Sequence, residues 1–304
     1  MKILLGPVVA LALAASALQP FPVAAWESDK GAEATYTFLP LSDLKDDDGK
    51  VWMHSVRAFA TAPIPVADSV FLALRAAYQG LFVAYEDIVF SYPDGKGGVF
   101  TEADLPDKLH ALDAALGVGA ALSDELSVYG EFQPGIHSDF EDVTSQDVYY
   151  QGGLMASWKF SEELTGIVGV YYGDDFGEPE VFPLLGVEWQ IDDDWALDLF
   201  LPEYGVFGYR AAEWLTVGLR GRLEGHQFRL SEMTPWENTV ARYEQVLAGP
   251  FLDLHFSRHV SLRLEGGIAT GRTFEFRDAD SSAKLYNGDL EDGGYLSVSL
   301  AGYF

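Results

Sequence analysis

Three things that this chain lacks narrow its class before any motif is considered. It has no cysteine, so a small scaffold held together by disulfides is excluded, and stability must come from a large core or a closed sheet. After the N-terminal segment it has no apolar run of about 18 residues, the length that a spanning helix needs. The best candidate, residues 70–85, is interrupted by Arg75, Gln79 and Gly80. We therefore expect no helical membrane span.

Positive charge is also scarce, with 19 Lys and Arg against 47 Asp and Glu and a formal net charge of -28. Such a surface repels nucleic acid, so we expect no nucleic-acid partner. Acidic connections would suit a lipopolysaccharide surface bridged by divalent cations. A merely solvated acidic surface explains the charge equally well, and both readings stay open.

The N-terminal segment has the pattern of an export signal. Lys2 precedes an apolar run over residues 3–18, and Val23-Ala24-Ala25 places small residues where a signal peptidase cleaves. We predict a cleaved signal peptide over residues 1–25 and a single domain over residues 26–304.

The remaining apolar residues are spread through short segments in which apolar and polar side chains alternate. Residues 126–133, 215–223 and 260–265 show the alternation most clearly. A period of two indicates strands with one apolar and one polar face. A soluble sandwich and a membrane barrel share this pattern, so alternation alone does not choose between them.

The connections between these segments favour the barrel. Five are short, at residues 122–126, 160–164, 191–195, 211–214 and 256–260, and they alternate with longer polar stretches. Short turns at one end and long loops at the other are typical of outer-membrane barrels. One connection breaks the rule, because residues 201–204 are very short where a long loop belongs. We expect this short hairpin, next to Pro202, to span poorly or to form a dent in the wall.

Aromatic residues collect at both expected strand ends. Near the short turns lie Trp158, Trp189, Trp195 and Trp214, and near the long loops lie Tyr149, Tyr150, Tyr171 and Tyr172. Indole and phenol rings favour membrane interfaces, so we interpret these residues as two interfacial belts.

The fold class predicted from these patterns is all-β, a transmembrane antiparallel up-and-down β-barrel of about 14 strands, with 12 as the other possible count. The predicted strands cover residues 32–40, 50–60, 67–80, 107–121, 126–136, 148–159, 164–174, 181–191, 195–201, 204–210, 214–228, 239–256, 260–277 and 293–304. The last strand alternates and ends in an aromatic residue. We expect Leu300, Gly302 and Phe304 to form the signal that the outer-membrane assembly machinery recognises.

Residue patterns for catalysis or metal binding are weak. His54-Ser55 and His137-Ser138 are neighbours along strands, so their side chains point to opposite faces, and no Gly-x-Ser-x-Gly elbow occurs. His226 is expected to point inward, with Ser231 nearby in the sequence. The acidic run at 46–48 lacks the alternating ligands and the distal Glu of a calcium loop. The acidic residues at 174–180 could hold calcium or bridge to lipid phosphates, but solvated loop charge explains them better. We therefore predict no enzyme activity, no catalytic residue, no metal site and no cofactor.

Charged residues on polar strand faces are the best candidates for a functional site. Arg220, Arg222 and Glu224 share the inward face of one strand, and Arg263 and Glu265 share that of another. They could line an aqueous pore, or they could pair with one another and plug the barrel, and both alternatives stay open. The intervening segment carries Arg242 and Glu244, whose faces are undetermined because Gly249-Pro250 could be a bulge that shifts the alternation.

One region resembles a known family. Residues 182–191 (FPLLGVEWQI), Asp194-Trp195-Ala196-Leu197, Leu201-Pro202 and Phe207-Gly208-Tyr209 resemble a domain-of-unknown-function family of predicted bacterial outer-membrane β-barrel proteins. The resemblance implies the barrel fold and the location, and it brings no substrate, cofactor or catalytic residue.

The function that we expect is that of a monomeric, porin-like channel for passive transport of small solutes, in contact with outer-membrane lipid and lipopolysaccharide. The alternative is a closed structural or surface-binding barrel without a pore, and an outer-membrane enzyme comes last.

Overall fold

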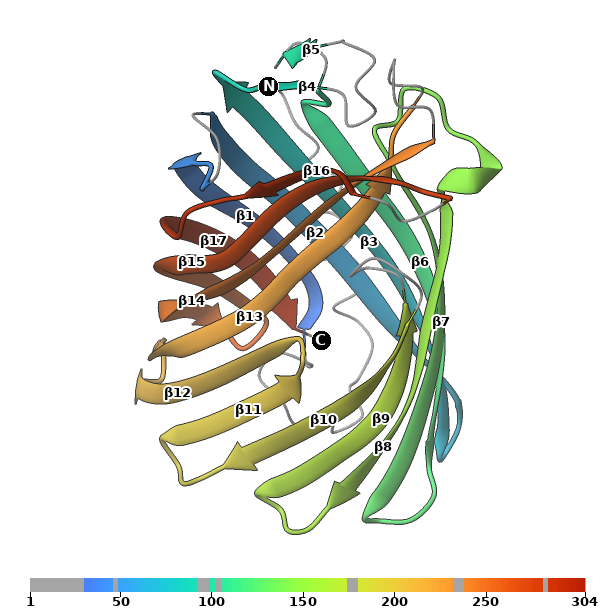
Figure 1. Ribbon diagram of the computed structural model, residues 1–304. Coiled ribbons are helices and arrows are strands. Elements are labelled where there is room, and N and C mark those ends of the chain that lie inside the picture. The colour runs from blue at the N-terminus through green and yellow to red at the C-terminus, as the bar shows by residue number, and fades with distance from the viewer. Residues whose placement is uncertain are drawn as a thin grey trace.

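The computed structural model describes residues 30–45, 49–91, 99–101, 105–173, 180–231, 238–280 and 284–303. The predicted signal peptide at 1–25, Phe304, and the acidic residues at 46–48 and 174–178 lie outside the described residues. Fourteen strands of the described chain form a closed antiparallel up-and-down barrel (Figure 1), as predicted. They are β1 (Lys30–Asp43), β2 (Lys50–Ala67), β3 (Val70–Glu86), β6 (Lys108–Ala121), β7 (Leu126–Ser138), β8 (Val148–Lys159), β9 (Leu164–Gly173), β10 (Glu180–Gln190), β11 (Trp195–Leu201), β12 (Tyr204–Ala212), β13 (Leu215–Arg229), β14 (Thr239–Ser257), β15 (Val260–Asp278) and β17 (Gly293–Tyr303).

Neighbours in sequence are neighbours in the wall, and β1 closes the ring by pairing with β17. Three shorter strands lie at the end of the barrel that carries the long connections (Figure 1): β4 (Val89–Ser91) and β5 (Val99–Thr101) pair with each other, and β16 (Lys284–Asp289) pairs with β15. We call this end the long-loop end and the opposite one the short-turn end. No helix in the described part of the chain is long and apolar enough to cross a membrane.

All five predicted short turns join strands at the short-turn end, and a sixth lies between β2 and β3 at residues 68–69. This turn was not predicted, because the second strand was expected to end at residue 60, whereas β2 continues through Pro63 and Pro65. Among the described residues, β2 pairs with β1 as far as Ala60↔Ala32, and beyond that point its last residues pair with β3 alone. Proline is tolerated there because an edge strand does not need every N–H for pairing.

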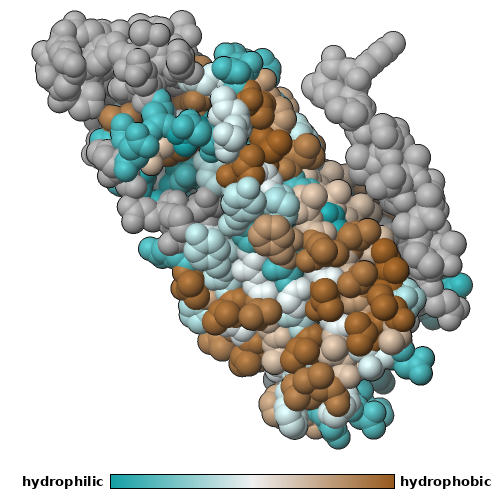
Figure 2. Space-filling model, turned by 90° about the vertical axis from the view of Figure 1, so that its right-hand side faces the viewer, coloured by the Kyte–Doolittle hydropathy of each residue, from teal (hydrophilic) through white to brown (hydrophobic). Residues whose placement is uncertain are grey.

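Alternation along each strand separates an apolar outer face from a more polar inner face. Leu116, Leu154, Val168 and Leu296 point outward with half or more of their surface exposed. Figure 2 shows such apolar residues gathered over the wall, with hydrophilic residues toward both of its ends. The four tryptophans of the predicted belt near the short turns also point outward.

The tyrosine belt is only partly as predicted. Tyr150 and Tyr172 are exposed on the outer face, at 56% and 47%, but Tyr149 is 7% exposed and stacks on His137 inside the barrel. Tyr171 also points inward, where its hydroxyl donates to Gln151 Oε1 at 2.8 Å. Adjacent residues of a strand must face opposite sides, so a pair of neighbouring tyrosines cannot supply two belt residues.

The alternation of β14 is not reset at Gly249-Pro250. Its register with β13 is unbroken from Leu215↔Leu254 to Arg229↔Val240. Arg242 and Glu244 therefore both point outward, where they form an ion pair with each other. The bulge hypothesis was wrong, and these two residues do not belong to the barrel interior.

Candidate functional site

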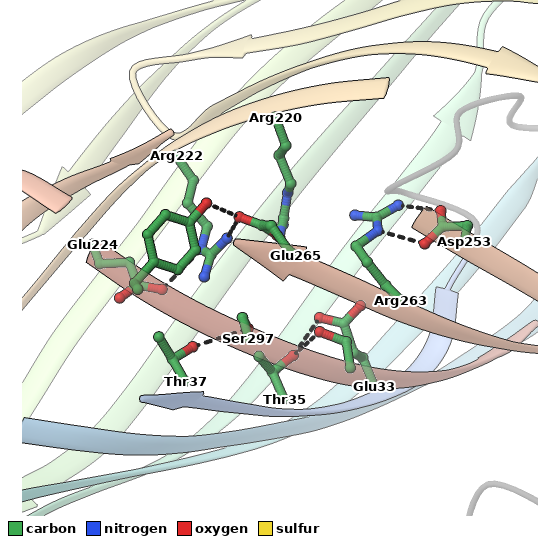
Figure 3. Close-up of polar contacts among 12 residues, drawn as sticks. Glu33, Thr35, Thr37, Arg220, Arg222, Glu224, Asp253, Arg263, Glu265 and Ser297 are labelled. Carbon is green, nitrogen blue, oxygen red and sulfur yellow. Dashed lines mark hydrogen bonds and ion pairs between the residues drawn. The ribbon is translucent and has the colours of Figure 1, made fainter. Parts of the chain in front are cut away.

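The predicted interior charges do come together on one wall of the barrel. Arg222 Nε donates to Glu224 Oε1 at 2.9 Å, and Arg220 Nη1 donates to Glu265 Oε2 at 3.1 Å. Arg222 also donates to Glu265, which in addition accepts the hydroxyl of Tyr295. These residues come from β13, β15 and β17, and their side chains converge in the close-up of Figure 3.

A second pair continues this wall toward the short turns. Arg263 donates from Nε and Nη2 to the two oxygens of Asp253, both at 2.7 Å, and each side chain is 4% exposed. The guanidinium also lies 4.7 Å from the centre of the Phe251 ring. A bidentate, buried pair of this kind has little freedom to rotate toward a passing ion.

Hydroxyl groups complete the polar surface where β1 meets β17. Thr35 and Ser299 lie 2.8 Å apart, and Thr37 and Ser297 lie 3.1 Å apart (Figure 3). These cross-strand contacts satisfy buried hydroxyls, so the inner face here is polar without carrying charge.

All five predicted residues, Arg220, Arg222, Glu224, Arg263 and Glu265, thus point into the interior, four of them ion-paired with one another and Arg263 ion-paired with Asp253. Of the two alternatives left open by the sequence, the pairing is present. That they line an open pore stays a prediction, because their charged atoms are engaged with one another.

Arg57 is an interior cation that sequence reasoning did not single out. It comes from β2, far around the ring from β13, yet its Nη1 lies 3.7 Å from Glu224 Oε1. Its side chain is 45% exposed, whereas that of Glu224 is 2% exposed. Solvent therefore reaches the interior on the Arg57 side. The sequence signal was a positive charge on the same strand face as Met53 and Ser55.

The turn between β11 and β12 contributes a carboxyl group to the same region. Glu203 is exposed in this turn, where the surrounding protein raises the pKa of its carboxyl and the nearby Arg75 and Arg57 oppose that rise. Arg75 lies on β3 with its guanidinium 5.1 Å from the centre of the Phe59 ring. We call the solvent-reached region around Arg57, Arg75 and Glu203 the hydrated compartment.

Toward the long-loop end the interior is apolar and filled. Inward side chains of β1, β2, β3 and β6 pack against those of β13, β14, β15 and β17. Fully buried members include Leu39, Leu81, Leu109, Phe228 and Phe276, each 0% or 1% exposed. We call this group the long-loop core, and its packed side chains occupy interior space in that half of the barrel.

The residues considered for catalysis do not assemble into a nucleophile and base. His137 Nε2 lies 2.8 Å from Asp113 Oδ1 in the buried interior, with the His226 ring centre 5.6 Å away. Ser231 does not join them, because its hydroxyl donates to Asp139 at 2.7 Å. In the described part of the chain no group of His, Asp and Glu is arranged to hold a metal.

The outer face of β17 carries the described part of the predicted assembly signal. Leu300 and Gly302 lie on its outward face, and Ser299 and Ala301 lie buried on the inward face. Phe304 is outside the described residues, so recognition of this segment stays a prediction.

A protein-family comparison matches residues 85–301, from the end of β3 into β17. The chain belongs to the family Domain of unknown function (DUF6268). The match confirms the resemblance drawn from residues 182–209, and it extends over most of the DUF6268 barrel. No curated protein matches the chain.

Several solved structures are similar to the DUF6268 chain at low sequence identity. One is an outer membrane channel from Pseudomonas putida F1, with 9% identity and a TM-score of 0.42 over 94% of this chain and 100% of that chain. Another is a TodX monoaromatic hydrocarbon channel mutant, with 10% identity and a TM-score of 0.37 over 90% and 89%. A third is the NanC porin, with 8% identity and a TM-score of 0.34 over 89% and 100%.

Proposed function

We propose that the chain is an outer-membrane β-barrel that transports small solutes through its interior. The apolar outer face, the closed wall and the predicted export signal support the location, because only a closed sheet satisfies its backbone groups in lipid. The observation that carries the transport role is Arg57. An arginine side chain inside the barrel that is 45% exposed marks interior space that solvent fills.

The long-loop core limits the kind of transport. Because apolar side chains fill the interior at that end, a wide, permanently open axial pore is not supported. We propose a narrow or gated route whose electrostatics are set by Arg57, Arg75 and Glu203, rather than by the paired network on β13 and β15. The same core favours the second candidate function, a closed barrel with a structural or surface-binding role.

Single-channel recording separates the two candidates. The chain has no native cysteine, so in Arg57→Cys the introduced thiol is the only one. We expect current from the refolded protein in a planar bilayer, and a shift toward cation selectivity when this thiol is modified with a sulfonated methanethiosulfonate. The matched control is Leu116→Cys, whose position is on the outer face and 50% exposed, and whose modification should leave the current unchanged.

Absence of current from protein that is inserted and folded would refute the transport role and leave the closed barrel. Arg220→Glu and Arg222→Glu are poor probes of a pore, because reversal of either charge breaks the buried network and destabilises the fold. The folding of each variant should be checked by testing whether its barrel stays folded in detergent that has not been heated.

A further inference from the structure

Hydrogen-bonded pairing is interrupted over one part of the barrel wall. β12 pairs with β13 only as far as Tyr204↔Arg222, and β11 pairs with β10 only as far as Leu201↔Leu185. Beyond these pairs, toward the long-loop end, β13 and β10 continue with no described strand between them. At about 3.3 Å per residue the unpaired edge of β13 is roughly 20 Å long. We call the region between residues 180–184 and 223–228 the wall gap.

Contacts at both ends hold the wall gap in shape. At its floor, the N–H of Leu223 donates to the carbonyl of Glu203 at 2.8 Å. At its upper corner, Gln227 Nε2 donates to the Tyr149 hydroxyl at 3.4 Å, and β13 leaves its wall position to bridge β7 at Arg229↔Ser138. The gap is therefore a framed feature of the fold, produced by the shortness of the β11–β12 hairpin.

The outer rim of the wall gap is apolar. Val181, Leu185 and Leu201 point outward along it and are 67%, 56% and 51% exposed. Leu223 on β13 pairs with Val246 of β14, just below the outward ion pair of that strand. The gap thus begins within the apolar outer face, where unpaired backbone edges are tolerated only if they line a protein or water-filled passage.

Beneath the wall gap, the interior presents aromatic rings on the β9–β12 side, opposite the ion-paired Glu224 of β13. Phe182, Tyr171, Phe200 and Tyr204 point inward from β10, β9, β11 and β12, and all four are partly exposed. The rings of Phe200 and Tyr204 lie 6.0 Å apart. Partly exposed ring faces in a concave site bind small apolar molecules, particularly other rings.

We infer that the wall gap is a lateral portal through which a small, uncharged, ring-bearing apolar solute passes between the surrounding membrane and the barrel interior. The inference rests on the proposed transport function and names its substrate class. The long-loop core obstructs the axial path, whereas the wall gap joins an apolar exterior to an aromatic interior.

Thiol labelling of Phe200→Cys in proteoliposomes tests the portal, since the chain has no other cysteine. The probes are N-phenylmaleimide, which is neutral and carries a ring, and a maleimide that carries trimethylammonium, which Glu203 would attract rather than repel. We expect N-phenylmaleimide to label the introduced thiol more than about tenfold faster, because a fixed charge is disfavoured in the apolar rim. Phe182→Cys is a second reporter should Phe200→Cys fold poorly.

The decisive comparison adds a bulky residue at the rim of the gap. Leu223→Trp, combined with Phe200→Cys, should slow N-phenylmaleimide labelling about tenfold, a barrier increase near 1.4 kcal/mol by the usual conversion. Leu219→Trp is the matched control, because Leu219 has the same outward face of β13 but lies where β12 still pairs with it. Its labelling should stay within about twofold of the parent.

Labelling that Leu223→Trp leaves unchanged, or that the charged maleimide matches in rate, would overturn the portal and indicate entry from an aqueous end. These outcomes are separate from the fate of the proposed function, which depends on current and on modification of Arg57→Cys. Current together with labelling of Phe200→Cys that is insensitive to Leu223→Trp would leave a channel without a lateral portal.

Discussion

Replacing Glu265 with glutamine tests whether the interior network stabilises the barrel. The native carboxylate is 1% exposed and accepts hydrogen bonds from Arg220 at 3.1 Å, from Arg222 and from the hydroxyl of Tyr295. Glutamine keeps the size of the side chain and one acceptor oxygen. The change therefore isolates the loss of the negative charge.

The expected loss of stability in Glu265→Gln follows from the distances within the interior network. A pair of unit charges about 3 Å apart at an effective dielectric constant near 20 attracts by roughly 5 kcal/mol, and desolvation offsets much of this. Removal of one partner of a buried pair costs about 3–5 kcal/mol in measured cases. Arg222 keeps Glu224 at 2.9 Å as an acceptor. We therefore expect the free energy of unfolding to fall by about 3 kcal/mol, at the lower end of that range.

Urea unfolding in lipid vesicles, followed by tryptophan fluorescence, measures this loss. The control is Glu244→Gln on the outer face, where Glu244 is 28% exposed and pairs with Arg242. An ion pair that solvent reaches contributes about 1 kcal/mol or less. Equal losses for Glu265→Gln and Glu244→Gln would refute the view that burial gives the interior network its importance.

Three further perturbations test other parts of the structure. Asp253→Asn removes the negative charge from the carboxylate that Arg263 binds. We expect the free energy of unfolding to fall by about 3 kcal/mol in the same urea assay. An unchanged urea midpoint would show that the Asp253–Arg263 pair does not stabilise the barrel. Phe276→Ala should lower the free energy of unfolding by about 3–5 kcal/mol, because Phe276 is 0% exposed in the long-loop core. The conductance should also rise. A folded variant with unchanged conductance would show that this core does not obstruct the axial route. Leu116→Arg on the outer face should destabilise the barrel in vesicles by about 2–4 kcal/mol, whereas Leu122→Arg in a short turn should have little effect. Similar losses of stability for the two variants would contradict a lipid-facing wall.

Local patterns in the sequence determined the fold class. The alternation at 215–223 and 260–265 depends only on where successive side chains of an extended chain point, so it identified both strands and their inward charges. The short connections were equally readable, because two or three polar residues between apolar segments allow only a tight turn. The shortness of residues 201–204 predicted a hairpin that spans poorly or forms a dent, and the pairing of β11 and β12 with their neighbours does end at Leu201 and Tyr204.

Where the pattern failed, the cause was pairing with a distant strand. Pro63 and Pro65 are unsuited to a central strand, but within the described residues the pairing with β1 ends before them and leaves them on an edge. Gly249-Pro250 suggested a bulge, but a continuous partner in β13 holds the register. The aromatic residues near the loops suggested that Tyr149 belongs to the outer belt. Alternation excludes this role, because Tyr149 must face the opposite side from its neighbour Tyr150, and it is 7% exposed.

Sequence alone thus decided that this chain forms a closed barrel and which faces of its strands are polar, because both follow from contacts between residues near one another in the chain. Only the tertiary structure decided that Arg220 and Arg222 are bound by Glu265, that Arg57 remains exposed, and that an apolar core packs inside the barrel toward the long-loop end. Those outcomes depend on how far the ring of strands is staggered and flattened when it closes. That geometry is a property of all the strand pairings together, so no single segment encodes it.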